Sequence, residues 1–217
     1  MPLYEQYYVF FMILRPTKKN IELIASALRK AEVVALPTDT LYALSADASN
    51  SYAVQQVYSM KQRARLKALP IFCTDIAQVE TICLLSPFAR KLAEEFWPGA
   101  LTLILPIKEV TCFIAPDAYP NDTNVAVRIP DSEMIRELIR ILGKPLTATS
   151  ANLSGQAPGN DPQEIASLFG DSLLILDDKN RNAVGVASTI VKPGGNSIEI
   201  IREGRIPSSQ LLIDKYL

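Results

Sequence analysis

Four cationic side chains alternate with other residues in one short segment of the sequence, and no acidic residue lies among them. They are Lys61, Arg63, Arg65 and Lys67. In an extended segment, the two-residue period of a strand would place all four on one face. Such a face needs an anionic partner, for example a triphosphate or a nucleic-acid backbone. In a solvated loop after a helix, by contrast, Lys61 and Arg63 would only complement the C-terminal end of the helix dipole.

Short polar side chains also follow a predicted strand in the stretch PTDTLY (37–42). Thr38, Asp39 and Thr40 come directly after an apolar run that Pro37 ends. Ligands in open α/β sheets bind at strand ends, so these side chains are candidates for a binding site. An ordinary turn, in which the Asp39 carboxylate accepts hydrogen bonds from nearby backbone amides, explains the same residues.

Hydroxyl and amide side chains gather again in the stretch TATSANLSG (147–155). They could bind the phosphates of a nucleotide or a small polar substrate, although threonine is also simply a favourable strand residue. Separately, Arg128 directly follows the apolar run 125–127. A buried arginine must be paired, either with a substrate carboxylate or phosphate or with a structural aspartate.

The composition excludes several kinds of catalysis. The 217 residues include no histidine, which rules out imidazole bases, histidine-activated nucleophiles and histidine-bound zinc within this chain. Neither a P-loop motif nor the GxGxxG fingerprint of dinucleotide-binding folds occurs. Lysine plus arginine total 22 and aspartate plus glutamate 23, a net charge of −1, which excludes a polycationic surface but not a local basic site.

The cysteines and the N-terminal segment bear on the compartment. Cys73, Cys83 and Cys112 form no CxxC pair, so we do not expect a disulfide framework. We expect the protein to occupy a reducing compartment. The apolar run 7–14 is shorter than the roughly 20 residues that span a bilayer. It also lacks the basic start and cleavage site of a signal peptide. We expect this run to form an opening β-strand in a cytoplasmic protein.

Helical and strand patterns alternate along the chain, without a linker rich in Gly, Ser or Pro. The expected N-terminal caps are Asn20, Ser86, Asp131 and Asp161. The expected helices cover 20–30, 51–61, 86–96, 131–143 and 161–170. The expected strands cover 33–36, 69–73, 101–107, 146–150, 173–176, 188–191 and 198–202. This order predicts a single α/β domain with a mixed rather than purely parallel β-sheet.

Taken together, the stretches resemble the YrdC-type family of threonylcarbamoyl-AMP synthases in order and spacing. The resemblance runs from about residue 33 to residue 204. The matching stretches are PTDTLYAL (37–44), MKQR (60–63), WPGALTLIL (97–105), VAVRIP (125–130), TSANLSG (149–155), AST (187–189) and IIREG (200–204).

The resemblance implies a nucleotidyltransferase of the short, single-domain form. Its YrdC-like domain over 12–217 would have a twisted mixed β-sheet flanked by helices and a basic concave face. Residues 1–11, which have no counterpart in the family, would be an N-terminal extension or first strand. Such an enzyme condenses L-threonine, bicarbonate and ATP into threonylcarbamoyl-AMP and releases pyrophosphate, with Mg²⁺ accompanying ATP. The product would feed the threonylcarbamoyladenosine modification of tRNA through separate transferase proteins. The basic face implies RNA binding, and no membrane partner is expected.

The resemblance also carries site residues over to this chain. Lys61 and Arg63 would be catalytic, binding the ATP phosphates, and Arg128 would take the threonine carboxylate. No side-chain metal ligand is implied. The threonine-binding residues would be Thr40, Arg128 and Ser188. The ATP-binding residues would be Lys61, Arg63, Lys67, Ser150, Asn152 and Arg202.

The chain departs from the family pattern at a few positions. Ala43 replaces the usual glycine after the tyrosine, and Ala64 and Ala68 replace prolines. Phe72 stands where many members have a histidine that touches the threonine, and a phenyl ring cannot donate a hydrogen bond. Two alternative functions stay open. One is a protein that keeps the YrdC-like fold and basic face and binds double-stranded RNA or tRNA without the activity. The other, which Phe72 allows, is a paralogue that uses another amino acid.

Overall fold

Two mixed β-sheets carry the strands of the computed structural model, which describes residues 12–65, 67–109, 113–119, 123–170, 172–179 and 185–211. The five-stranded sheet consists, in spatial order, of β1 (Ile13–Leu14), β9 (Leu174–Leu176), β2 (Val34–Leu36), β3 (Ala43–Ser45) and β8 (Thr149–Ser150). The six-stranded sheet consists of β11 (Ser197–Arg202), β10 (Thr189–Gly194), β5 (Leu101–Pro106), β6 (Asn124–Arg128), β4 (Ile71–Phe72) and β7 (Leu146–Thr147).

The predicted mixed α/β class is confirmed, but the strands are divided between two sheets. The expected strand 146–150 is in fact two strands that lie in different sheets. Leu146 pairs with Phe72 in the six-stranded sheet, whereas Ser150 pairs with Ala43 in the five-stranded sheet. Ala148 lies between them, and its amide donates to the Pro70 oxygen at 2.8 Å. The chain therefore crosses from one sheet to the other within a single residue.

The described residues contain six α-helices and two short 3₁₀ helices. The α-helices are α1 (Lys18–Arg29), α2 (Ser51–Lys61), α3 (Ile76–Ile82), α4 (Pro87–Phe96), α5 (Glu133–Leu142) and α6 (Pro162–Phe169). The 3₁₀ helices are η1 (Pro116–Ala118) and η2 (Ser208–Gln210). Five of the α-helices were predicted. Only the seven-residue α3 was missed, because two turns are too short for a clear apolar period.

Two of the four predicted caps are correct. Ser86 and Asp161 cap α4 and α6 through their side chains. Asn20 does not cap α1, because Thr17 accepts the Asn20 amide at 3.3 Å and the helix starts before its first apolar residue. Asp131 does not cap α5 either, because the cap position is the next residue, Ser132.

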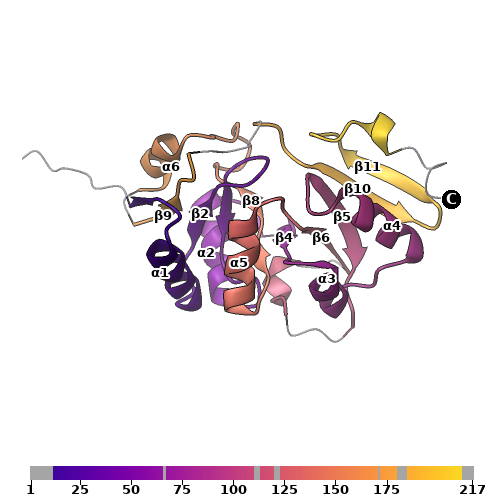
Figure 1. Cartoon of the computed structure of the whole chain (residues 1–217), viewed down its shortest axis with the longest axis horizontal. Coiled ribbons are helices and arrows are strands. Elements are labelled where there is room, and N and C mark those ends of the chain that lie inside the picture. Colours follow the sequence, from indigo (N-terminus) through magenta and orange to yellow (C-terminus); the bar gives the residue numbers. More distant parts are fainter. Residues whose placement is uncertain are drawn as a thin grey trace, which may run out of the picture.

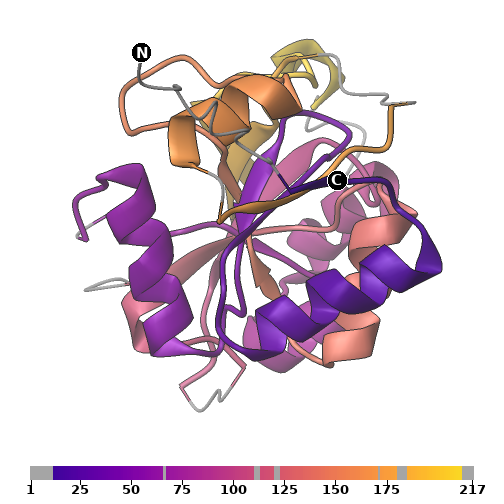
Figure 2. The same ribbon diagram turned by 90° about the vertical axis from the view of Figure 1, so that its left-hand side faces the viewer.

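The helices cover the sheets in layers (Figure 1). Alternate residues of β2 point to opposite faces of the five-stranded sheet, as the pleat requires. Val34 and Leu36 share a core with α1 and α5, whereas Ala35 shares another with α2 and α6. Figure 2 shows α2 on one side of this sheet and α1 with α5 on the other. A third core packs α3 and α4 on the six-stranded sheet.

The N-terminal prediction is tested only in part. Of the expected strand 7–14, the structure shows Ile13–Leu14 as β1, which pairs in parallel with β9. Residues 1–11 and Cys112 lie outside the described ranges. Among the described residues, no helix combines the length and the apolar character needed to cross a membrane.

Candidate active site

A cavity of about 420 Å³ has walls from both sheets. The turn after β2 and the end of β8 contribute from the five-stranded sheet, and β4, β5, β6, β10 and β11 contribute from the six-stranded sheet. Its hydroxyl-bearing residues are Thr38, Tyr42, Thr40, Thr102, Thr149, Ser150 and Ser188. Its cationic residues are Arg63, Arg128 and Arg202. The cavity thus combines positive charge with hydrogen-bonding hydroxyls, which suits a polar anionic ligand.

A second cavity, of about 250 Å³, adjoins the first. Arg63, Ser150 and Asn152 line both cavities, so the two are chambers of one site. Lys61 and Lys67 add positive charge to the second chamber. This smaller chamber, which three cationic side chains line, has the chemistry that phosphate groups require.

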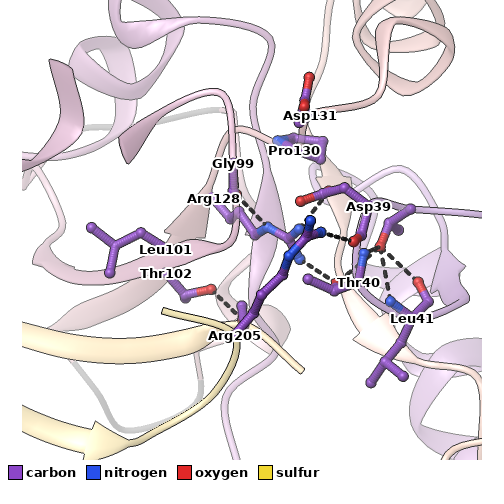
Figure 3. Close-up of polar contacts among 12 residues, drawn as sticks. Asp39, Thr40, Leu41, Gly99, Leu101, Thr102, Arg128, Pro130, Asp131 and Arg205 are labelled. Carbon is purple, nitrogen blue, oxygen red and sulfur yellow. Dashed lines mark hydrogen bonds and ion pairs between the residues drawn. The ribbon is translucent and has the colours of Figure 1, made fainter. Parts of the chain in front are cut away.

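Arg128, at the end of β6, is the most extensively paired cation of the larger chamber (Figure 3). Its Nη2 donates to the Asp39 carboxylate at 2.5 Å, its Nη1 to the Thr40 hydroxyl at 2.7 Å and its Nε to the Gly99 oxygen at 2.8 Å. Burial lowers the pKa of Arg128, and the adjacent Asp39 carboxylate opposes that shift. The ion pair is buried on both sides and joins one sheet to the other.

The turn that holds Asp39 differs from the simple turn considered from the sequence. Thr38, not Asp39, makes the local bonds, because its hydroxyl accepts the amides of Thr40 at 2.9 Å and Leu41 at 3.2 Å. The Asp39 carboxylate is thereby free to reach Arg128. Of the two partners considered for Arg128, the structure shows the aspartate.

Phe72 of β4 lies beneath Arg128. The guanidinium carbon is 5.8 Å from the centre of the phenyl ring, a distance at which cation and ring attract each other. Phe72 lines the larger chamber and is only 2% exposed. The ring therefore supports the guanidinium but presents no hydrogen-bond donor to a ligand.

Lys61, the last residue of α2, is buried beneath the loop that follows β8. Its ammonium group donates to the main-chain oxygens of Ser150 and Asn152, the latter at 2.8 Å, and to the Asn152 side-chain oxygen at 3.1 Å. An ammonium group has three N–H donors, so these acceptors engage all of them. Burial, with a smaller contribution from the neighbouring Arg63 charge, lowers the pKa of Lys61 to about 8.

The four cations of the basic segment do not share one face. Gln62 adopts a left-handed conformation, with φ of 50°, and ends α2, so the segment turns instead of extending. Arg63 donates to the Lys67 oxygen at 3.3 Å and to the Ala68 oxygen at 2.7 Å. Arg65 is exposed, and it does not belong to the described residues that line the two chambers.

Ser188, directly before β10, lies in a hydroxyl pair at the opposite wall. Its hydroxyl is 2.8 Å from that of Thr102 on β5. Arg202 of β11 donates to the Ser188 main-chain oxygen at 2.9 Å through Nη2. These bonds fix the orientation of Ser188 toward the larger chamber, and burial lowers the pKa of Arg202.

Metal ligands were not expected from side chains. Within the ranges that the structure describes, no three or more carboxylate or thiol side chains come together as a metal-binding group.

Comparison with known proteins places this geometry in a family. The family model for the Sua5, YciO and YrdC proteins, described as "Telomere recombination", matches residues 26–204. The chain belongs to this family. The resemblance seen in the sequence is therefore confirmed.

Curated members of the Sua5/YciO/YrdC family carry the name threonylcarbamoyl-AMP synthase. The Bacillus subtilis protein is 36% identical over 188 residues, which cover 86% of this chain and 54% of that protein. The Idiomarina loihiensis protein is 34% identical over 172 residues, which cover 78% of this chain and 91% of that protein. The chain thus spans about half the length of the Bacillus relative and most of the Idiomarina relative.

Solved structures of the family have the same fold. The crystal structure of Pyrococcus abyssi Sua5 complexed with L-threonine gives a TM-score of 0.84 at 29% identity, covering 93% of this chain and 59% of that one. Escherichia coli YciO gives a TM-score of 0.78 at 21% identity, covering 94% and 98% of the two chains. At that lower identity the likeness concerns the fold alone.

Every site residue carried over from the resemblance lines one of the two chambers. The residues are Thr40, Lys61, Arg63, Lys67, Arg128, Ser150, Asn152, Ser188 and Arg202. The roles assigned to them stay predictions.

Sequence reasoning missed two further contacts. Thr102 pairs with Ser188, and Arg205 donates to the Asp39 main-chain oxygen. A structural aspartate was considered for Arg128, but the sequence did not identify it as Asp39. A polar residue inside the apolar run 101–107 was a signal for Thr102. Nothing in the sequence pattern indicated the contact of Arg205.

Proposed function

We propose that the chain is a threonylcarbamoyl-AMP synthase, which makes threonylcarbamoyl-AMP and pyrophosphate from L-threonine, bicarbonate and ATP. The observation that carries the proposal is the pair of adjoining chambers, which share Arg63, Ser150 and Asn152. The names of the Bacillus and Idiomarina relatives and the threonine complex of Pyrococcus Sua5 support the same assignment.

The proposed reaction joins two anions. The threonine amine and bicarbonate form a carbamate with loss of water, and a carbamate oxygen then bonds to the α-phosphorus of ATP. The bond from that phosphorus to the leaving pyrophosphate breaks in the same displacement. Such chemistry depends mainly on holding the reactants together and on neutralising the developing phosphate charge. Arginine and lysine supply that charge without histidine.

The larger chamber is proposed to take the amino acid. Thr40, Arg128 and Ser188 all line it, and Thr40 and Arg128 are already bonded to each other. Within the described part of the chain, three of the five N–H donors of Arg128 bind Gly99, Thr40 and Asp39. We propose that the remaining donors bind the threonine carboxylate.

The smaller chamber is proposed to take the ATP phosphates. Lys67 and Arg63 line it together with Ser150 and Asn152, and Arg202 would contact the nucleotide from the opposite wall. We propose that Mg²⁺ enters with ATP and is held chiefly by phosphate oxygens and water, its usual mode of binding. When bound, the ion would neutralise phosphate charge.

A pyrophosphate-release assay tests the proposal directly. Purified protein would be given ATP, Mg²⁺ and bicarbonate, with L-threonine, L-valine, L-serine or no amino acid. Release that requires threonine, with threonylcarbamoyl-AMP identified by mass spectrometry, supports the synthase. Release with another amino acid instead would show a paralogue, as the Phe72 substitution allows. No release under any condition would contradict the proposal.

We further propose that the product passes to tRNA through separate threonylcarbamoyl-transferase proteins in the cytoplasm. The reactivity of an acyl adenylate supports the need for an acceptor. The free, buried thiols of Cys73 and Cys83 agree with a reducing compartment.

A further inference from the structure

Arg205 joins the two sheets beside the larger chamber (Figure 3). It follows β11 of the six-stranded sheet, and its Nη1 donates to the main-chain oxygen of Asp39, in the turn after β2. The same turn presents the Asp39 carboxylate and the Thr40 hydroxyl to Arg128. Arg205 therefore holds the backbone of the residue whose side chain holds Arg128.

The backbone around Arg205 is fixed on β10. The Arg205 amide donates to the Ala187 oxygen at 2.9 Å. On either side, the Thr189 hydroxyl accepts the amides of Gly204 at 2.9 Å and Ile206 at 3.1 Å. Hydrogen bonds thus hold the backbone at Arg205 and at both of its neighbours, and the Arg205 side chain is directed at the turn.

The charges around Arg128 show that Arg205 orients the turn and does not neutralise the Asp39 carboxylate. Arg202 and Arg205 both lie close enough to Arg128 to disfavour its charged form, and Asp39 is the carboxylate that favours it. Arg205 donates to a main-chain oxygen and not to that carboxylate. The carboxylate is left to Arg128, while Arg205 fixes the peptide that carries it.

We propose that Arg205 is a positioning residue for the amino-acid end of the cavity. By holding the Asp39 peptide against the six-stranded sheet, it sets the orientation in which Thr40 and Arg128 meet the substrate. This role rests on the proposed function, because it assigns that end of the cavity to the amino acid. It predicts a selective effect on amino-acid binding, with the nucleotide chamber unaffected.

Two measurements on Arg205→Ala test the proposal. Hydrogen–deuterium exchange of the peptide covering 37–44 needs no substrate, and we expect faster exchange than in the wild type. In the pyrophosphate-release assay, we expect the KM for threonine to rise about ten-fold, because Thr40 and Arg128 would meet the substrate in a less favourable orientation, while the KM for ATP stays near the wild-type value. Arg205→Lys keeps a donor and a charge, so it should recover part of both effects.

Arg29→Ala is the matched control. Arg29 is also an exposed arginine that donates to a distant main-chain oxygen, that of Ile141, but it lies on α1 away from both chambers. Arg29→Ala should change neither measurement.

Unchanged exchange at 37–44 in Arg205→Ala, or an equal rise of both KM values, would overturn the proposal. If the wild type releases no pyrophosphate, the proposed synthase fails, while the exchange result still decides the role of Arg205. Should Arg205→Ala not fold, Arg205→Lys and Arg205→Gln carry the same exchange comparison.

Discussion

The basic side chains of the site differ in how far protein oxygens already engage them. Among the described residues, Lys61 directs all three of its N–H donors to Ser150 and Asn152, whereas Arg63 uses two of its five. Arg63 therefore keeps donors for a phosphate, while Lys61 would have to release a carbonyl to bind one. This difference makes Arg63 the stronger candidate for direct contact with ATP.

Replacing Arg63 should greatly reduce turnover. In Arg63→Ala, loss of the charge proposed to neutralise the reacting phosphate should lower kcat by about 10²- to 10³-fold. Steady-state pyrophosphate release measures this. The double variant with Arg65→Ala excludes rescue by the neighbouring arginine, and Arg65→Ala alone should be nearly normal. Normal turnover in Arg63→Ala would refute the assignment.

Lys61 should make the stability of the protein depend on alkaline pH. Its pKa in the folded protein is about 8, below the ordinary value of 10.5, so between those values the unfolded chain binds more protons than the folded one. Stability contributed by this group must therefore rise with pH from about 8 to 10.5 and stay constant below pH 8. Urea unfolding of the wild type and Lys61→Met at several pH values isolates the effect as a difference. A difference that does not change over this range would contradict it.

At the scale of elements, the end of β11 is fitted closely against the start of β10. A Cβ atom on Gly204 would lie 2.3 Å from the Ala187 oxygen and 2.6 Å from the Ser188 oxygen, closer than atoms can approach. Only glycine lets the two backbones meet there. This close approach places Ser188 between Arg202 and Thr102.

Gly204→Ala should consequently disturb both stability and the site. We expect a loss of about 2 kcal/mol in the free energy of unfolding, because the clash involves main-chain atoms that must shift. Gly194→Ala on β10 is the control, since the added atom there meets only the Ser197 hydroxyl at an ordinary 3.7 Å. Thermal or urea unfolding of both variants measures the difference. Equal stability of the two variants would show that the backbone adapts without cost.

At the scale of the whole molecule, the sequence predicts elements well and their assembly poorly. The helix α4 with its Ser86 cap and the strand β5 follow from local patterns, because periodicity and caps depend on neighbouring residues. Sheet membership is not local. The residue pattern of 146–150 is that of one continuous strand. It would be the same if all five residues lay in a single sheet, so the division at Ala148 could not be predicted.

The candidate site shows the same contrast between what is local and what is not. Its residues could be named because the resemblance supplied them, but the partners of those residues could not be named. Asp39 and Arg128 are separated by 89 positions in the chain, and nothing in the pattern around either residue specifies the other. Only the three-dimensional structure distinguishes between the alternative partners of Arg128.

The Asp39–Arg128 pair should couple the two sheets energetically. Arg128→Met leaves a buried carboxylate unpaired and Asp39→Asn leaves a buried guanidinium, and each should cost about 3–5 kcal/mol. The double variant should cost less than the sum of the two. A double-mutant cycle measured by urea unfolding gives the coupling energy, and additive losses would mean that the pair contributes no coupling between the sheets.

The one-residue crossing at Ala148 has a consequence for motion. A rotation of one sheet against the other would bend the chain at this residue, since β7 and β8 are hydrogen-bonded into different sheets on either side of it. Ser150 ends β8 and Asn152 lies in the loop that follows, and Lys61 fastens both to α2. Because Ser150 and Asn152 line both chambers, a movement of one sheet against the other should change the shape of both chambers together.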